Sequence, residues 1–293
     1  MKTTSIREFV TAVMTAMENI LDGYDIEEKD IVKMNDIVNH GLCARRKGEN
    51  AGATVYLDDA YERGEDINSV ASTLADIVLE ADSHKPINVD SDFDFSFDAI
   101  KDRLTVRLVD IEKNRAYLAE HPHREIGAGL AVIAEINVGD EYSIVVTNDL
   151  ARDYGYDINT IFDTALANMQ ALYPAQMMSL ESAIFGNGSN ILDSEGEDID
   201  GMYTLMIDGS RNFGACSLAY KGIAERIRRL FGSGYYILPS SLHEVILLKD
   251  DGTPNAADLK AMVEQANRSV VAPSDVLSDS VFYYGTDGLS RVA

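Results

Sequence analysis

The pattern that most constrains the fold of this chain is a buried strand, an acidic turn and an amphipathic helix within residues 141–169, EYSIVVTNDLARDYGYDINTIFDTALANM. The preceding string GLAVIAEINV joins it through the turn GDE, which predicts an antiparallel hairpin. Over about 158–171, apolar residues recur at helical spacing on one side: Ile158, Ile161, Phe162, Ala165 and Met169. The segment therefore predicts a hairpin with a helix packed on it.

A second copy of this pattern occurs earlier in the chain. Residues 41–80 align with 132–171 without a gap, and in that register the strings Asp66-Ile-Asn-Ser and Asp157-Ile-Asn-Thr coincide. Gly64 also meets Gly155, as expected where a left-handed residue ends one helix and an aspartate caps the next. We predict an internal hairpin–helix repeat; two unrelated hairpins that obey the same turn rules are the alternative.

The remaining patterns predict an α+β fold, in which antiparallel β-hairpins are packed by helices. A capping box, Ser5 with Glu8, begins a helix over 4–21, and a further helix is expected over 177–186. Helical periodicity stops within 84–98, which places a boundary near residue 88. This predicts an N-terminal α+β unit, 1–88, and a C-terminal α+β unit, 89–293, although the two could also pack as one domain.

The charge of the chain is extreme and restricts its partners. With 25 basic and 49 acidic side chains, the formal net charge is −24, and the acids are spread along the sequence. Such a field repels phosphate backbones, so no direct nucleic-acid binding is expected. The same acids could imitate DNA towards a basic partner, or could simply keep the protein soluble.

The sequence indicates a cytoplasmic protein. It holds no apolar run near the ~18 residues that a membrane helix needs, so no membrane association is expected. The start, MKTTSIREFV, lacks the features of a secretory signal. The two cysteines, Cys43 and Cys216, fit a reducing compartment and have no metal-knuckle spacing.

Two histidines in the string His121-Pro122-His123 suggest a metal site. Proline favours an extended conformation for the residue before it, so both imidazoles could point the same way. A zinc site needs three or four protein ligands. His243 and Glu125 are the best additions, so the candidate metal ligands are His121, His123 and His243.

A second polar corner, PSSLHE, suggests hydrolase chemistry through Ser240, Ser241, His243 and Glu244. The glycines of a nucleophile elbow are missing, and Ser241 with Glu244 also reads as a capping box on one helical turn. We hypothesise that His123 and His243 approach each other and form a polar pocket with Glu125 or Glu244. No dinucleotide loop, P-loop or zincin helix is present, so no cofactor is assigned.

The acidic loop 186–201 superficially suggests calcium binding. An EF-hand loop needs glycine at position 6 and glutamate at position 12. Counting from Asp193, these positions hold Asp198 and Thr204, so the match fails and the loop receives no role.

Several strings in order resemble a family of Firmicutes proteins catalogued as a domain of unknown function. They are PHREI (122–126), VVTNDLARDYGYD (145–157), AYKGIAERI (219–227) and LPSSLHEVILLKDDG (238–252). The middle portion is also distantly similar to the YtpQ-like family. The resemblance implies a cytoplasmic bacterial α+β protein and supplies no catalytic residue.

Three functions follow as hypotheses. The first is a non-enzymatic protein that binds a macromolecular, protein partner through an acidic surface. The second is a hydrolase or metal-dependent enzyme that uses His123 and His243 with the neighbouring serines and glutamates. The third is a DNA mimic that inhibits a basic nucleic-acid-binding protein. Oligomeric state is not predicted.

Overall fold

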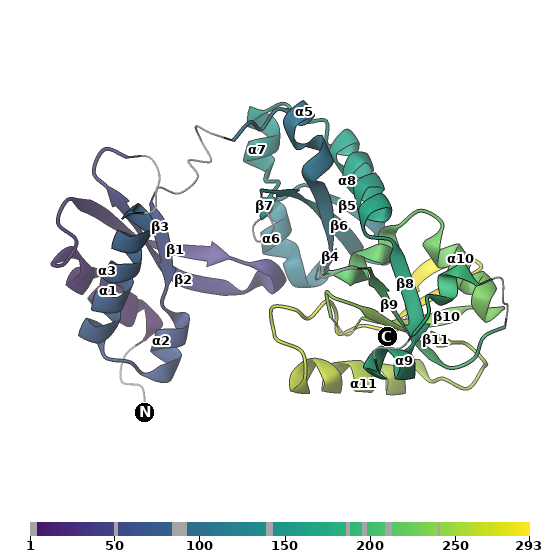
Figure 1. Ribbon diagram of the computed structural model, residues 1–293. Coiled ribbons are helices and arrows are strands. Elements are labelled where there is room, and N and C mark those ends of the chain that lie inside the picture. Colours follow the sequence, from purple (N-terminus) through teal and green to yellow (C-terminus); the bar gives the residue numbers. More distant parts are fainter. Residues whose placement is uncertain are drawn as a thin grey trace. The chain divides into compact units, whose positions relative to one another are not determined.

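A computed structural model describes residues 5–49, 52–83, 93–138, 143–185, 188–194, 198–208, 213–239 and 241–293. The chain forms two compact units, an N-terminal unit of residues 1–94 and a C-terminal unit of residues 95–293 (Figure 1). The boundary predicted near residue 88 falls within 84–92, which lies outside the described residues. In the described parts of the chain, no helix has the length and apolar character to cross a membrane.

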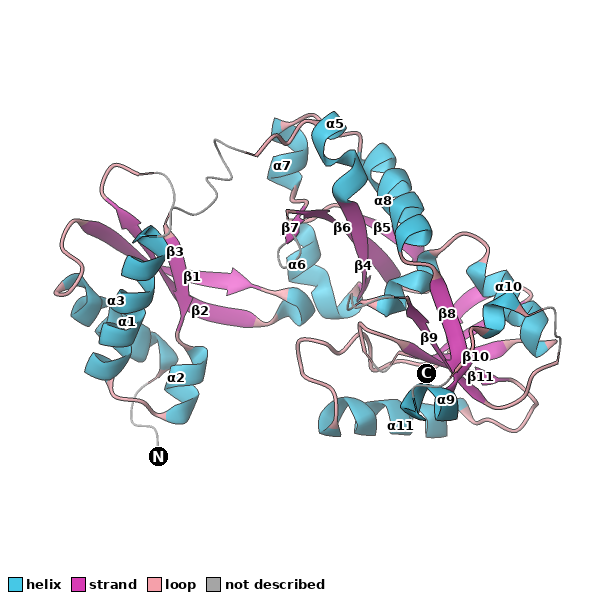
Figure 2. Ribbon diagram, in the orientation of Figure 1, coloured by secondary structure: helices cyan, strands magenta, loops and turns pink. Residues whose placement is uncertain are grey.

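The N-terminal unit is a three-stranded antiparallel sheet with helices on one face (Figure 2). The strand order is β1 (Tyr24–Val32), β2 (Val38–Arg46), β3 (Ala53–Tyr56), and the helices are α1 (Ile6–Glu18), α2 (Asp58–Arg63) and α3 (Ile67–Ser83). The predicted capping box is confirmed, because Ser5 Oγ accepts from the Glu8 amide and the Glu8 carboxylate accepts from the Ser5 amide.

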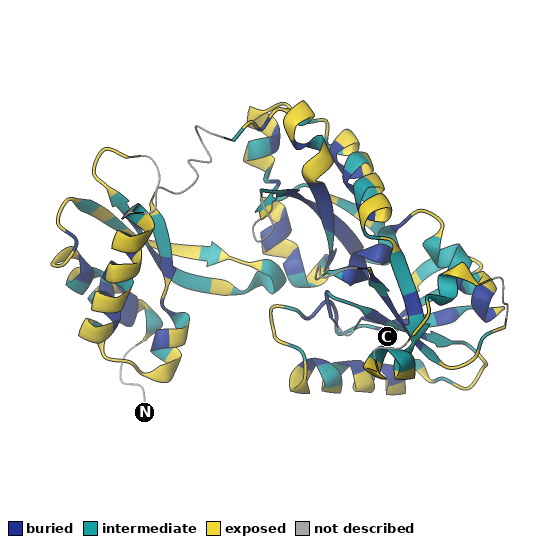
Figure 3. Cartoon of the chain, viewed as in Figure 1, coloured by how far each residue is buried: buried dark blue, intermediate teal, exposed yellow. Residues whose placement is uncertain are grey.

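The core of this unit lies between the sheet and helices α1 and α3. Because strand side chains alternate between faces, every second residue of β2 and β3 enters this core. The buried residues include Phe9, Val13, Met17, Leu42, Ala44, Val55, Ala75 and Val78. On the opposite face, Asp25, Glu27 and Tyr56 are exposed (Figure 3).

The C-terminal unit begins with a four-stranded antiparallel sheet. Strand β6 (Leu130–Asn137) is central and pairs with β4 (Leu104–Asp110), β5 (His123–Gly127) and β7 (Ser143–Val145). Helices α5 (Phe97–Ile100), α6 (Arg115–Ala119), α7 (Asn148–Asp153) and α8 (Ile158–Leu172) accompany it, and α8 packs against β4 and β6. Seven of the eight residues of β6 are buried, which accounts for its nearly continuous apolar string.

A six-stranded antiparallel sheet completes this unit. Its order is β13 (Gly288–Arg291), β12 (Phe282–Gly285), β10 (Tyr235–Leu238), β11 (Val245–Lys249), β9 (Met202–Ile207) and β8 (Ala175–Ser179). The helices here are α9 (Leu180–Phe185), α10 (Ile223–Phe231) and α11 (Ala256–Ser269). The helix predicted over 177–186 is therefore wrong in its first half, because Met177 pairs with Leu205 in the sheet. A short apolar run does not distinguish a strand from a helix by period alone.

The two segments of the predicted repeat share one order of elements in the structure. In each unit a hairpin (β2–β3 or β6–β7) leads into a short helix and then a long one (α2–α3 or α7–α8). Gly64 and Gly155 end the short helices with φ of 68° and 63°. The amide after each glycine donates to a carbonyl five residues back, at 3.0 Å from Glu65 to Ala60 and at 2.9 Å from Tyr156 to Ala151.

The caps of the long helices also correspond. Asp66 accepts from the Ser69 amide at 3.0 Å, and Asp157 accepts from the Asn159 amide at 3.3 Å. The short helices begin differently: Thr147 caps α7 through the Leu150 amide, whereas no side chain caps α2 at its N-terminus. In topology β4 is the counterpart of β1, since each pairs with the first strand of the repeated hairpin.

Candidate functional site

In the 121–125 segment, His121 lies between α6 and β5 and His123 begins β5, and both have local partners. The His121 ring stacks on Tyr117 at 4.0 Å between centroids, and its Nδ1 lies 2.7 Å from the Tyr117 carbonyl oxygen. His123 is exposed, with Nδ1 3.2 Å from the His121 carbonyl oxygen. Exposed Glu125 accepts from the Gly129 amide at 3.4 Å. Each imidazole thus faces a backbone carbonyl of its own segment.

The 239–244 segment connects β10 with β11, and Ser240 lies outside the described residues. Ser241 is buried, and its Oγ accepts from the His243 backbone amide at 3.1 Å. The capping box predicted for Ser241 and Glu244 is wrong, because residues 241–244 form no helical turn and β11 begins at Val245. The backbone turns around the serine hydroxyl instead.

Both ring nitrogens of His243 are engaged. Nδ1 accepts from the Phe213 amide at 3.2 Å, and Nε2 lies 3.5 Å from a carboxylate oxygen of Asp275. A serine nucleophile needs a ring nitrogen of its base as hydrogen-bond partner. Ser241 instead meets the backbone of His243, so these two residues are not arranged as nucleophile and base.

A buried ion pair, which the sequence interpretation missed, lies next to this histidine. Arg107 on β4 places Nη2 2.6 Å from Oε1 of Glu135 on β6. The Arg107 guanidinium carbon also lies 3.8 Å from the centroid of the Phe213 ring, a cation–π contact. Phe213 has φ of 80°, in the left-handed region that a bulky residue rarely adopts. We call Arg107, Glu135, Phe213, His243 and Asp275 the Arg107 cluster.

The Arg107 cluster links the two sheets of the C-terminal unit. It continues to Tyr117, where burial raises the pKa of the phenol, Arg107 lowers it and Glu135 raises it. The signal in the sequence was a charged residue flanked on both sides by apolar ones: Arg107 in LTVRLV and Glu135 in GLAVIAEINV. Such residues are usually paired when buried. Arg107 is paired with Glu135, and Asp275 lies beside Nε2 of His243, which suits a positioning role.

The predicted metal ligands do not form a ligand set. His121 and His123 bond to carbonyls beside β5, whereas His243 bonds to Phe213 and Asp275. Among the described residues, no group of three or more His, Cys, Asp or Glu side chains is placed to hold a metal ion. The predicted pocket would place His123 and His243 together with a glutamate, but the polar contacts of His123 and His243 are with different residues.

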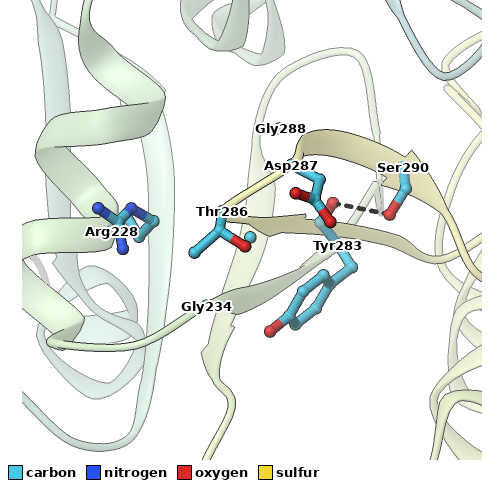
Figure 4. A pocket seen from close by; sticks show the side chains of 8 residues that line it. Arg228, Gly234, Tyr283, Thr286, Asp287, Gly288 and Ser290 are labelled. Atoms are coloured by element: carbon cyan, nitrogen blue, oxygen red, sulfur yellow. Dashed lines mark hydrogen bonds between the residues drawn. The ribbon is translucent and has the colours of Figure 1, made fainter.

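A cavity of about 310 Å³ lies beside the β12–β13 hairpin (Figure 4). It is lined by Arg228, Gly234, Tyr283, Gly285, Thr286, Asp287, Gly288 and Ser290. Arg228 makes two hydrogen bonds to Glu225, and Tyr283 donates to Asp250 at 2.9 Å. Its volume is at the lower end for ligand sites, and Arg228 and Tyr283 already have protein partners.

The most acidic surface lies on the N-terminal unit. Residues 1–94 hold 9 basic and 20 acidic side chains, so a net charge of −11 falls on less than a third of the chain. On strand β1, Asp25, Glu27 and Glu28 are exposed. Among the described residues, ion pairs occupy Asp30 (with Arg7) but none of those three carboxylates. We call Asp25, Glu27 and Glu28 the β1 acidic strip.

Comparison with known proteins identifies a family whose function is unknown. Residues 6–286 match the model described as Family of unknown function (DUF5688), so the chain belongs to this family. No curated protein and no solved structure matches it.

Proposed function

We propose that this member of the DUF5688 family is a non-enzymatic binding protein that takes a basic protein partner on the β1 acidic strip. One observation carries the proposal: three exposed carboxylates lie within four residues of one strand, and among the described residues none of the three forms an ion pair. An unneutralised strip of this kind attracts basic surfaces and accelerates encounter with them.

The conformation of the strip supports this role. Asp25 and Glu27 lie on the sheet face opposite α1, because strand residues two apart share a face. Their cross-strand neighbours are Arg45 and Cys43. Thr11 on α1 donates to Glu28 at 2.7 Å, which holds that side chain on the helix-covered side. Carboxylates therefore flank β1 on both faces, with the strand backbone between them.

The arrangement of the histidine corners favours binding over catalysis. His243 has both ring nitrogens occupied, and Ser241 does not face either of them. We therefore infer that the Arg107 cluster holds the two sheets of the C-terminal unit in place and that partner recognition belongs to the N-terminal unit.

The test is a cross-linking pull-down with the full chain at physiological salt. A triple variant of the strip, Asp25→Asn, Glu27→Gln and Glu28→Gln, should lose the partner. A matched control, Glu18→Gln, Glu62→Gln and Asp76→Asn, removes the same charge from exposed positions on α1, α2 and α3 and should keep it. Equal retention by both triples, or no specific partner for the wild type, contradicts the proposal. Displacement of the partner by duplex DNA would identify the interaction as DNA mimicry.

A further inference from the structure

The backbone of β1 offers a way of binding that goes beyond charge. This strand lies at one edge of the three-stranded sheet, and its nine residues pair continuously with β2 from Tyr24 with Arg46 to Val32 with Val38. Lys47 donates its amide to the Gly23 carbonyl at 3.0 Å, and Lys33 donates to the Ile37 carbonyl at 2.8 Å. These two bonds continue the register of the β1–β2 pairing by one residue beyond each end of β1.

These two bonds fix which residues face outward. In an antiparallel ladder, residues bonded to the neighbouring strand alternate with residues whose N–H and C=O point away from it. Residues 23 and 33 form backbone hydrogen bonds with the chain of β2. The backbone groups of the odd-numbered residues of β1 therefore also point towards β2. The even-numbered residues present their amide and carbonyl groups at the outer edge; they are Tyr24, Ile26, Glu28, Asp30 and Val32.

Within the N-terminal unit no strand pairs with this edge. Among the described residues of this unit, no backbone or side-chain hydrogen bond reaches the outward groups of residues 24–32. The edge strand β8 of the C-terminal unit differs, because the Asn190 amide accepts from the Met177 N–H at 2.9 Å and donates to the Ala175 carbonyl at 3.2 Å. Exposed edges are usually short, bulged, interrupted by proline or charged. β1 is long, regular and free of proline, so only its charged side chains limit which strands can pair with it.

Charge decides what can occupy the edge. A strand added beside β1 would place its alternate side chains next to Asp25 and Glu27 on one face and near Glu28 on the other. Opposite charges in such cross-strand pairs stabilise the pairing, and like charges weaken it. A second copy of β1 would bring four acidic residues against one lysine, a net like charge, whereas an extended segment rich in lysine or arginine complements the carboxylates.

We infer that the partner binds by β-strand addition: an extended basic segment of the partner hydrogen-bonds to the outer edge of β1, and its basic side chains pair with the β1 acidic strip. This inference rests on the proposed function and specifies its partner and geometry. Main-chain bonds to the even-numbered residues supply affinity, and the carboxylates supply selectivity.

Amide hydrogen exchange tests this geometry directly. The probe is a nine-residue synthetic peptide of alternating lysine and valine, added to the full chain and followed by NMR. The amides of Ile26, Glu28 and Asp30 should exchange at least about tenfold more slowly with peptide, because they gain acceptors. The amides of Glu27 and Lys29 already bond to β2 and should change little.

A proline variant gives an independent readout. Glu28→Pro removes one outward donor while leaving the bonds to β2 in place, and it should abolish peptide binding. Glu28→Gln keeps the donor and should bind with an affinity within about tenfold of the wild type, since one cross-strand charge pair contributes up to about 1 kcal/mol. If the proline variant does not fold, the exchange pattern of the wild type still decides the matter.

The outcomes separate this inference from the proposed function. If the wild type binds neither the peptide nor any basic protein, the proposed function fails and the inference fails with it. If binding depends on the strip carboxylates but the even-numbered amides stay unprotected and Glu28→Pro still binds, the proposed function stands and strand addition is refuted.

Discussion

Phe213 donates its backbone amide to Nδ1 of His243 at 3.2 Å, so the imidazole must be an acceptor on that side. Two backbone bonds next to it involve Leu242: the Ala215 amide donates to the Leu242 carbonyl at 3.1 Å, and the Leu242 amide donates to the Asp275 carbonyl at 2.8 Å. The connection between β10 and β11 is therefore tied to the segment that carries Phe213.

Substitution of His243 should reveal this structural role. His243→Ala removes the acceptor of the Phe213 amide and should lower the free energy of unfolding by about 1–2 kcal/mol. His243→Asn can present Oδ1 in place of Nδ1 and should retain most of the stability. Urea unfolding of both variants measures the difference. A loss as large in the asparagine variant as in the alanine variant would contradict the acceptor role.

Loss of one partner of the Arg107–Glu135 pair should destabilise the protein strongly, whereas replacement of both partners by apolar residues should destabilise it much less. Removing one partner, as in Arg107→Met, leaves a buried carboxylate and should cost about 3 kcal/mol of unfolding free energy. The double variant Arg107→Met with Glu135→Leu should recover much of that loss. A double-mutant cycle by chemical denaturation gives the coupling energy, and additive losses would rule out a coupled pair.

The two cysteines should differ sharply in reactivity. Burial raises the pKa of the Cys216 thiol to about 12, whereas Cys43 is only partly buried. At pH 8 a thiol reagent should therefore label Cys43 alone in the folded protein and both cysteines in denaturant. Rapid labelling of both thiols under native conditions would show that the environment of Cys216 opens.

The same thiol predicts a loss of stability at alkaline pH. In the unfolded chain Cys216 deprotonates near its ordinary pKa of 9.0, but in the folded protein it keeps its proton to about pH 12. The unfolded state then binds fewer protons, so stability falls as pH rises from 9 to 12. Cys216→Ala should flatten this part of a thermal stability profile, and an unchanged slope would mean that other groups cause it.

The repeated glycines should respond alike in the two units. Gly64 and Gly155 both have positive φ, and a Cβ added at either would meet no atom within 4 Å. Alanine at each position should therefore cost about 1–2 kcal/mol through backbone strain alone. Asparagine, which tolerates this conformation better, should cost less. A clear difference between Gly64→Ala and Gly155→Ala in calorimetry would contradict equivalence of the two turns.

Local patterns predicted most of the elements. The apolar spacing over 158–171 predicted α8, and the hairpin–helix echo predicted the glycine that ends α2 and the aspartate that caps α3. Strand β5 was missed because His123, Arg124 and Glu125 leave its apolar alternation weak, and β8 was taken for a helix. In both cases pairing with a buried neighbour, not local propensity, decides the conformation.

The Arg107 cluster could not be predicted as an arrangement. Its members come from β4, β6, the segment before residues 214–219, the β10–β11 connection and the segment after α11. Only the packing of the two sheets brings these side chains together. The histidines were correctly noticed as unusual, but hydrogen bonds to backbone groups account for both His121 and His243.

The hairpin–helix repeat has an evolutionary consequence. In the C-terminal copy, β4 contacts the segment Gly214–Ala219, which leads towards the six-stranded sheet. In the N-terminal copy, the corresponding strand β1 has no hydrogen-bonded neighbour on its outer side among the described residues of that unit. If the two copies arose by duplication of one ancestral module, the strand β4 of the C-terminal copy became part of a larger unit, whereas the strand β1 of the N-terminal copy kept an unpaired edge. Mutations along that edge could then create a binding site without changing the core.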